Sequence, residues 1–273
     1  MKILLIGYGK MGRLLEARLA ERGHEIAAVA DPYYAENSKA AFTPNGAFVF
    51  SSLTEAKKGV STDGRKTFDL PGIDAALEFS HPDAAVENLL FLAREKIPSV
   101  AGTTGWYAKL PDVNRAVNEA GSSLVWSSNF SLGVNIFYRI AANAAKMIDP
   151  FKEYDVAGFE THHNNKADSP SGTAKTLVER VLAQMTRKKR AVYQTLDRKP
   201  EADELHYASL RVGTVPGTHS LLFDSAADTI EITHTARSRE GFAAGAVLAA
   251  EWLTAKKRTG VFTVDDVLAD ILP

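Results

Sequence analysis

Short aliphatic runs alternate with helical spacing through the first half of the chain. The run Lys2–Ile6 ends at Gly7, the run Ile26–Ala30 ends at Asp31, and between them the apolar residues of Arg13–Arg22 recur at helical intervals. The same alternation continues in the strand-like runs Ala75–Phe79, Pro98–Ala101 and Leu124–Trp126 and in the helical segment Pro82–Lys96. Strands that alternate with helices predict an α/β fold with a doubly wound parallel sheet of Rossmann type.

Beyond residue 130 the pattern changes. A long helical segment, Leu132–Ile148, precedes a strand-like run over Asp155–Thr161 and a second helical segment over Ala174–Met185. Three further alternating runs follow at short intervals: His206–Val212, Thr218–Asp224 and Thr229–Thr235. They predict a second, α+β domain with an open mixed sheet whose strands are mostly antiparallel.

Polar stretches and the end of the chain complete the outline. Thr54–Asp69 predicts a surface helix and loop, Arg187–Arg190 a solvated helix end, and Thr195–Leu205 a charged loop. Gly241–Leu253 has helical spacing, and Thr263–Asp266 resembles a capping box that starts a last short helix. We expect these final helices to pack on the first domain, so that residues 1–130 and 241–273 form one domain and residues 131–240 the other.

A glycine-rich turn lies between the first strand and the first helix. It reads Gly7-Tyr8-Gly9-Lys10-Met11-Gly12, and an acid, Asp31, follows about 20 residues later at the end of the next strand. Glycines permit a tight turn and the close approach of a pyrophosphate, while the helix N-terminus supplies N–H donors. Turn glycines without a ligand are the alternative, but strand, helix and acid together favour a dinucleotide-binding domain.

The residues around Asp31 bear on the choice of cofactor. Asp31 can accept hydrogen bonds from an adenosine ribose. Pro32-Tyr33-Tyr34-Ala35 follows and contains no basic residue to meet a 2′-phosphate, which a carboxylate repels. The sequence therefore favours NADH, with NADPH accepted if a basic group comes from elsewhere in the fold.

Composition narrows the class of protein. The chain has 273 residues, a formal net charge of −1 and 45% hydrophobic residues, enough for two modest domains with their own cores. The near-zero charge gives no support for a nucleic-acid or membrane-surface partner. Because there is no cysteine, disulfides, thiolate nucleophiles and Cys-ligated metals are excluded, and we expect no metal site. Neither a signal peptide nor a membrane span is indicated, so we expect a cytoplasmic protein.

One stretch in the second domain collects groups that suit chemistry on an anion. It runs from Glu160 to Leu177 as ETHHNNKADSPSGTAKTL. Lys166 offers a cation, and Ser171-Gly172-Thr173 at a helix start offers N–H donors and a hydroxyl for a dicarboxylate. In an extended segment His162 and His163 point to opposite sides, so one can supply a proton after hydride transfer while the other binds substrate. A polar surface loop with a capped helix is the alternative.

The pattern E-x-H-H-x-x-K-x-D-x-P-S-G-T-A in this stretch resembles the signature of the 4-hydroxy-tetrahydrodipicolinate reductase family, also called dihydrodipicolinate reductase. The resemblance extends to the loop Gly7–Gly12, to Gly102–Gly105, to Asn129–Asn135 and to Glu231–His234. It implies reduction of 4-hydroxy-tetrahydrodipicolinate to tetrahydrodipicolinate by NADH or NADPH, with loss of water, in diaminopimelate and lysine biosynthesis. It also implies a homotetramer joined through the sheets of the second domain.

The resemblance further implies roles for individual positions. His162 matches the proton donor and acceptor, and Lys166 matches the second catalytic residue. The substrate positions are His163, Ser171, Gly172 and Thr173, with Arg239 as a weaker match. The cofactor positions are Gly7, Tyr8, Gly9, Lys10, Met11, Gly12, Asp31, Phe79, Gly102, Thr103, Thr104, Ser127, Ser128, Asn129 and Phe130, with Gly102–Thr104 and Ser127–Phe130 on the nicotinamide side.

The sequence departs from the family pattern at two places. The loop Gly7–Gly12 is one residue shorter than the common G-x-x-G-x-[MV]-G, and Ser128 stands where a proline is usual. Two other functions stay open: a different two-domain reductase, such as an amino-acid dehydrogenase, and a protein that senses NAD(H) without turnover. A sensor would not need two histidines and a lysine facing an anion pocket.

Overall fold

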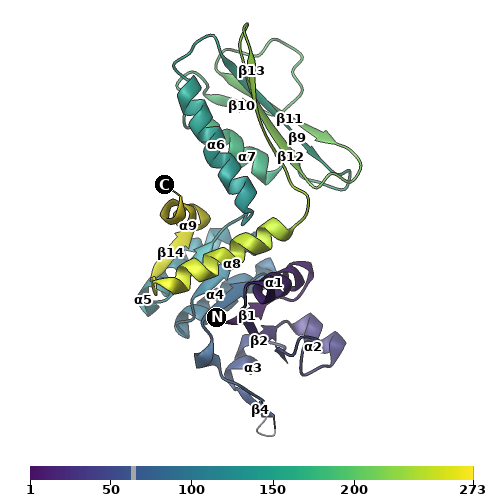
Figure 1. Cartoon of the computed structure of the whole chain (residues 1–273), viewed down its shortest axis with the longest axis vertical. Helices are drawn as coiled ribbons and strands as arrows, with labels where there is room; N and C mark the ends of the chain where they lie inside the picture. The colour runs from purple at the N-terminus through teal and green to yellow at the C-terminus, as the bar shows by residue number, and fades with distance from the viewer. Residues whose placement is uncertain (63–65, 273) are drawn as a thin grey trace. The chain divides into compact units, whose positions relative to one another are not determined.

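The computed structural model of the chain describes residues 1–62 and 66–272. Its contacts divide the chain into a first unit, Met1–Ser131 with Arg239–Pro273, and a second unit, Leu132–Ser238 (Figure 1). Each unit has its own sheet and its own buried apolar core.

Seven strands form the sheet of the first unit, in the order β14-β8-β7-β6-β1-β2-β3. Every neighbouring pair is parallel, so the predicted doubly wound sheet is confirmed. β1 lies between β2 and β6, which is where the strand order reverses and where such sheets bind ligands. The strands are β1 (Lys2–Ile6), β2 (Glu25–Ala30), β3 (Phe48–Phe50), β6 (Ala75–Glu78), β7 (Ser99–Ala101), β8 (Ser123–Trp126) and β14 (Gly260–Thr263).

Helices connect these strands and pack on the sheet. They are α1 (Lys10–Glu21), α2 (Pro32–Ser38), α3 (Leu53–Lys57), α4 (Pro82–Arg94), α5 (Leu110–Ala120), α8 (Glu240–Ala255) and α9 (Val264–Ile271), with 3₁₀ turns η1 (Leu70–Gly72) and η2 (Tyr107–Lys109). α8 is rich in Ala and Gly, and it packs closely on α1 and on β6, β7 and β8. The predicted capping box at α9 is confirmed, since Asp266 Oδ2 accepts from the backbone N–H of Thr263 at 2.7 Å.

The register of the parallel strands brings five sequence-distant turns to one edge of the sheet. Ile6 pairs with both Ala30 and Glu78, Glu78 pairs with Ala101, and Ala101 pairs with Trp126. The residues that follow these strand ends are Gly7, Asp31, Phe79, Gly102 and Ser127. The carboxyl edge of the sheet therefore gathers the turns that the sequence assigned to a cofactor.

The second unit contains a five-stranded sheet in the order β10-β11-β9-β12-β13. β10–β11 and β11–β9 are parallel, whereas β9–β12 and β12–β13 are antiparallel. The sheet is mixed, as predicted, but the expectation of a mostly antiparallel sheet was wrong. The strands are β9 (Asp155–His162), β10 (Arg190–Val192), β11 (Glu204–Arg211), β12 (Thr218–Asp224) and β13 (Thr229–Thr235).

Two helices cover one face of this sheet: α6 (Leu132–Ile148) and α7 (Gly172–Leu182) (Figure 1). Alternate residues of β9 face them, so Val156, Gly158, Glu160 and His162 are buried while the intervening side chains are more exposed. Among the described residues no helix covers the opposite face. Leu210 lies there opposite Thr161 and is 53% exposed.

Two local predictions differ from the structure. Arg187–Arg190 is not a helix end, because α7 stops at Leu182 and Arg190 starts β10. Within it Lys188 is buried, and its Nζ donates to the carbonyl of Glu204 at 2.7 Å and lies 2.5 Å from Asp155 Oδ1. Thr54–Asp69 holds part of α3 and then a hairpin, β4 (Val60–Thr62) with β5 (Lys66–Phe68), where a loop was expected; residues 63–65 of that stretch lie outside the described residues.

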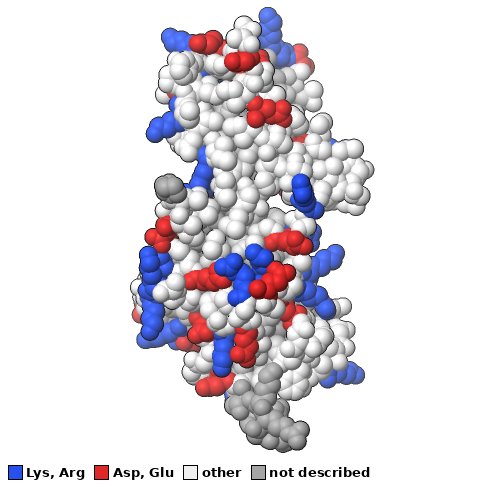
Figure 2. Space-filling model, in the orientation of Figure 1, with Lys and Arg blue, Asp and Glu red and all other residues white. Residues whose placement is uncertain are grey.

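The face of the molecule in Figure 2 has no large region of one charge sign among the residues that the structure describes. Lys and Arg side chains alternate with Asp and Glu side chains over the first unit in the face that Figure 2 shows. The part of the view where α6 lies is largely uncharged. Within residues 1–62 and 66–272, none of the helices combines the length and the apolar character that a bilayer span requires.

Candidate active site

A cavity of about 520 Å³ opens at the carboxyl edge of the first unit's sheet. Four of the predicted cofactor residues line it: Gly7, Gly9, Asp31 and Phe79. Its remaining walls come from the turn after β3, from the start of α2 and from α4, none of which the sequence had marked. Those residues include Tyr33, Ser52, Thr54, Asn88 and Arg94.

The three glycines of the first turn have different surroundings. Gly7 has φ +89°, and a β-carbon there would lie 2.3 Å from the carbonyl oxygen of Phe79. A β-carbon at Gly12 would lie 2.4 Å from the carbonyl oxygen of Gly7. At Gly9, in contrast, nothing lies within 4 Å, and no side chain caps the start of α1. The turn is thus closed on the protein side and open, with free helix N–H donors, on the side where a phosphate would approach.

Asp31 ties this turn to the next helix. Its Oδ2 accepts from the backbone N–H of Tyr8 at 2.6 Å, and its Oδ1 accepts from the backbone N–H of Tyr34 at 2.8 Å, which makes Asp31 the N-cap of α2. A carboxylate has about four acceptor positions, so Asp31 keeps capacity for ribose hydroxyls. The capping role was not recognised from the sequence.

A basic side chain reaches the Asp31 region from α1. The guanidinium of Arg13 lies 5.1 Å from the ring centre of Tyr8 and 5.7 Å from that of Tyr34. The Tyr8 hydroxyl itself donates to Glu16 Oε2 at 2.5 Å, and burial raises the pKa of this tyrosine. The Tyr8 ring therefore supports the turn and Arg13. Nothing in the sequence indicated this basic group, because Arg13 directly follows the third glycine and is 18 residues from Asp31 in the chain.

A smaller cavity of about 230 Å³ lies along the same edge. It brings together predicted residues from the turns after β6, β7 and β8, from the first turn of α1 and from the N-cap of α8; they are Met11, Phe79, Gly102, Ser127, Ser128, Phe130 and Arg239. Gly102 is needed because a β-carbon there would lie 2.1 Å from Cε1 of Phe79. Arg239, predicted at the substrate, thus lies among the residues predicted at the nicotinamide.

The other predicted cofactor residues line neither cavity. Thr103 is buried and its Oγ1 accepts from the backbone N–H of Ser80 at 2.9 Å, while Asn129 Oδ1 accepts from the backbone N–H of Ser131 at 2.9 Å. These two side chains shape the turns. Lys10 and Thr104 are exposed.

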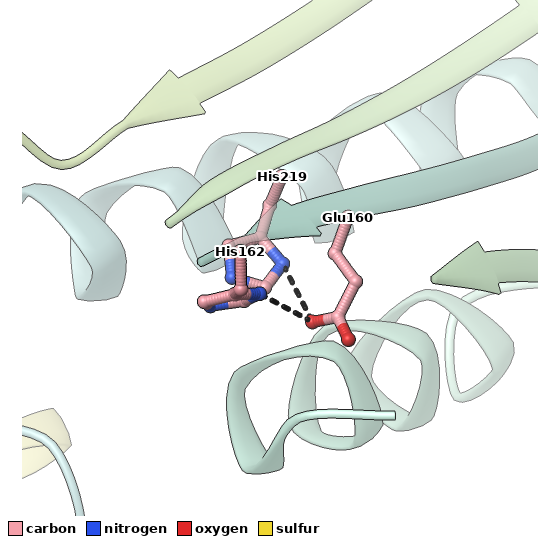
Figure 3. A group of neighbouring side chains, drawn as sticks. All are labelled: Glu160, His162 and His219. Atoms are coloured by element: carbon pink, nitrogen blue, oxygen red, sulfur yellow. Dashed lines mark ion pairs between the residues drawn. The ribbon is translucent and has the colours of Figure 1, made fainter. Parts of the chain in front are cut away.

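In the second unit the predicted acid, His162, lies at the end of β9 and is 7% exposed. Its Nδ1 lies 3.4 Å from Glu160 Oε2, and a dashed line marks this ion pair in Figure 3. Burial lowers the pKa of His162, and the charges of Lys166 and Arg211 lower it further, against the attraction of Glu160. His163, the next residue, is only half-buried, in agreement with side chains that point to opposite sides.

Lys166 lies four residues after His162, in the turn that follows β9. Its Nζ lies 2.6 Å from Asp168 Oδ1, and the Arg211 guanidinium donates to the backbone carbonyls of Lys166 and Asp168 at 3.3 and 2.6 Å. The Lys166 side chain is 21% exposed. The turn thus holds a solvent-accessible ammonium close to His162.

The start of α7 completes this group. Ser171 is the N-cap, and its Oγ accepts from the backbone N–H of Ala174 at 3.1 Å. Gly172 is exposed, with nothing within 4 Å of where a β-carbon would be, and Thr173 is half-buried. Glu160 contacts both His162 and Ser171, and the charge of Lys166 acts on the same imidazole, so the three groups lie around one part of the second unit.

Two buried residues of this site were given no role from the sequence. Glu160 is fully buried, and His219 on β12 lies with its Nδ1 3.8 Å from Glu160 Oε2 and 3.1 Å from the Tyr207 hydroxyl. Burial lowers the pKa of His219 to about 4. Glu160 stands in the recognised motif, but an acid in an apolar strand pattern carries no signal of what it faces.

Glu160, His162 and His219 place their ligand atoms within 4.8 Å of one another, close enough to hold a metal ion (Figure 3). Other contacts compete for these atoms. Both Glu160 oxygens accept hydrogen bonds from Ser171, and His219 Nδ1 faces the Tyr207 hydroxyl. We interpret the group as a hydrogen-bonded cluster.

Comparison with family models gives matches along nearly the whole chain. The model described as dihydrodipicolinate reductase, N-terminus, matches residues 1–130, and the model described as dihydrodipicolinate reductase, C-terminus, matches residues 133–268. The chain belongs to the dihydrodipicolinate reductase family. It is therefore an oxidoreductase.

Individual relatives agree with this assignment. The chain is 38% identical to a 4-hydroxy-tetrahydrodipicolinate reductase of Christiangramia forsetii over 273 residues, which covers 99% of both chains. It is 34% identical to a protein of the same name from Staphylococcus aureus, covering 98% of this chain and 100% of the relative.

Solved structures resemble the chain in fold. A dihydrodipicolinate reductase from Paenisporosarcina sp. TG-14, solved with dipicolinate bound, has a TM-score of 0.76 at 19% identity and covers 100% of this chain and 99% of that one. An engineered D-amino acid dehydrogenase bound to NADP⁺ has a TM-score of 0.54 at 13% identity, covering 98% of each chain. The chain thus shares its fold with an amino-acid dehydrogenase as well, and it is the sequence matches that decide the family.

Proposed function

We propose that the chain reduces 4-hydroxy-tetrahydrodipicolinate to tetrahydrodipicolinate, a step of diaminopimelate and lysine biosynthesis. The reaction consumes one hydride and one proton and releases one water. The nicotinamide, when bound, supplies the hydride. The observation that carries the proposal is that, in a chain of this family, Glu160 contacts both His162 and the start of α7, and the charge of Lys166 acts on the same imidazole.

His162 is the proton source in this proposal, and the start of α7 with Lys166 binds the dicarboxylate. The ammonium of Lys166 and the backbone N–H groups at the start of α7 complement negative charge. His163, Ser171 and Thr173 border the same place. Arg239, which lines the smaller cavity of the first unit, is a further candidate for binding the dicarboxylate. A bound dianion would raise the pKa of His162 from its lowered value, since negative charge favours the protonated imidazole.

Residues 1–130 with 241–273 serve as the dinucleotide-binding domain, and residues 131–240 serve as the substrate-binding and oligomerisation domain. The open space at Gly9 and the uncapped start of α1 suit a pyrophosphate. NADH is the favoured cofactor because Asp31 repels a 2′-phosphate. NADPH is the second cofactor, with Arg13 as the cation that meets its phosphate.

The uncovered face of the second unit's sheet supports a homotetramer joined through these sheets. Leu210 and Val212 are each 53% exposed at one end of it. On α6 the exposed apolar residues Ile136, Ile140 and Met147 add a second uncharged surface. A biosynthetic enzyme of this kind works in the cytoplasm.

The reaction can be tested by the loss of absorbance of reduced nicotinamide while dihydrodipicolinate synthase supplies the substrate. Turnover that requires the synthase is the expected result. Folded protein without turnover would contradict the proposal, and turnover of an amino acid with oxidised cofactor would favour an amino-acid dehydrogenase.

A further inference from the structure

The carboxylate of Glu160 is the most heavily used polar group in the second unit's site. It is fully buried on the helix-covered face of β9. Its Oε1 accepts from the backbone N–H of Ser171 at 3.0 Å and from Ser209 Oγ at 2.9 Å, and its Oε2 accepts from Ser171 Oγ. Burial opposes ionisation of Glu160, but these hydrogen bonds outweigh it, and the pKa of the carboxyl lies below its ordinary value.

The same carboxylate faces the imidazole of His162. Nδ1 of His162 has no hydrogen-bond partner among the described residues, and the atom it approaches is Glu160 Oε2 at 3.4 Å. A proton on Nδ1 is attracted by this anion, which leaves Nε2 as the nitrogen that can exchange a proton with substrate. The space beside Nε2 is kept by Gly217, where a β-carbon would lie 2.9 Å from Nε2.

We propose that Glu160 is a positioning residue, because one carboxylate both fixes the tautomer and direction of the His162 imidazole and anchors the start of α7. This inference rests on the proposed function, in which His162 supplies the proton and the start of α7 binds the dicarboxylate. Glu160 thus links the two parts directly, although nine residues divide His162, the last residue of β9, from Gly172, the first residue of α7. Groups held in this way lose less rotational freedom when substrate arrives.

A purely structural role for Glu160 makes a different prediction. Replacing a buried, hydrogen-bonded carboxylate destabilises a protein wherever it lies. Glu204 gives a matched control, because it is also buried and is held by Arg198 at 2.8 Å. It lies at the other end of β11 from Arg211, whose strand partner is His162. Glu204→Gln therefore reproduces the structural loss far from the imidazole.

The test compares Glu160→Gln, Glu160→Asp and Glu204→Gln in the full chain by pH profiles of kcat and kcat/KM. Glu160→Gln keeps the size of the side chain and removes the charge that favours protonated His162. We expect kcat to fall about 10–100-fold, the range seen when a metal-bound histidine loses the partner that orients it. We also expect the alkaline fall in activity to move to lower pH, with Glu160→Asp restoring part of its position and KM for NADH unchanged.

The outcomes separate the two hypotheses. A Glu160→Gln profile with the wild-type shape at reduced height, matched by Glu204→Gln, would overturn the positioning role and leave the proposed function intact. Absence of turnover in the folded wild-type chain would instead defeat the proposed function.

A second measurement needs no variant at position 160. Nitrogen NMR of the wild-type chain, with the His162 signals assigned through His162→Ala, reports which ring nitrogen carries the proton in the neutral form. We expect the proton on Nδ1. A proton on Nε2 would overturn the proposal even if Glu160→Gln does not fold.

Discussion

The Lys166 ammonium lies 2.6 Å from the carboxylate of Asp168, two residues along the chain. Their side chains are 21% and 59% exposed, so water screens the pair and its net contribution to stability is at most about 1 kcal/mol. Lys166 is thus held in place but is free to exchange its partner for a substrate anion.

We predict that Lys166→Ala lowers kcat/KM about 100-fold while the free energy of unfolding changes by less than about 1 kcal/mol, because the lost interaction with substrate exceeds the lost surface pair. Steady-state kinetics and urea unfolding measure the two quantities. Lys146→Ala, on the exposed side of α6, is the control. Equal losses in both variants would contradict a role for Lys166 in substrate binding or catalysis.

His162→Ala should lower turnover about 10²–10⁴-fold, the range for a positioned acid. The pH dependence of kcat/KM and of kcat should report the ionisation of His162. Since burial, Lys166 and Arg211 lower the pKa of His162 in the free protein, kcat/KM should fall with rising pH from a point below the ordinary histidine value of about 6.5. The fall in kcat should come at higher pH, because bound dicarboxylate favours the imidazolium. An unchanged alkaline fall in His162→Ala would assign the proton to another group.

Cofactor choice should respond in opposite ways to two substitutions at the same place. Asp31→Ala removes the repulsion of a 2′-phosphate and should raise kcat/KM for NADPH relative to NADH. Arg13→Ala should lower the ratio about tenfold, the equivalent of one charge-assisted hydrogen bond. Kinetics with both cofactors give the ratio, and Arg18→Ala, which breaks a surface pair with Glu21 on the same helix, is the control. Equal effects of Arg13→Ala on both cofactors would contradict the proposal that Arg13 binds the 2′-phosphate of NADPH.

His219 should make the fold sensitive to acid. Its pKa in the folded chain is lowered to about 4 by burial, against about 6.5 when unfolded. The unfolded chain therefore binds this proton first, so stability is complete above pH about 6.5 and falls as the pH drops towards 4, by at most about 3 kcal/mol. His219→Asn, whose amide can still reach the Tyr207 hydroxyl, should flatten this part of the curve of unfolding free energy against pH. A curve parallel to that of the wild type would mean that a residue other than His219 causes the acid sensitivity.

The first unit could be read from the sequence because its signals are local. A buried parallel strand is a short apolar run, and each run here ends in a turn residue such as Gly7 or Asp31. The second unit depends on pairing between distant strands. Nothing in Glu204–Arg211 indicates that it pairs in parallel with β9, and β10 has only three residues, of which the first is an exposed arginine.

The candidate site, too, was predicted only in part from the sequence. The motif located His162, Lys166 and the start of α7, and the structure brings them together. The partners Glu160 and His219 were not assigned, because their roles arise from the register of β9 against β12, where Glu160 stands opposite His219. Arg13 was missed for a similar reason: its position over the Tyr34 ring, close to the N-cap Asp31, follows from the fold and not from nearness in the chain.

A substitution at Gly217 offers a way to trap the protein with its cofactor and substrate bound but unreacted. Adding one methyl group there would push the imidazole of His162 aside, because a β-carbon would lie 2.9 Å from its Nε2. Such a protein should still take up reduced cofactor and dicarboxylate yet leave both unreacted, which would let crystallographers capture the intact substrate beside the nicotinamide.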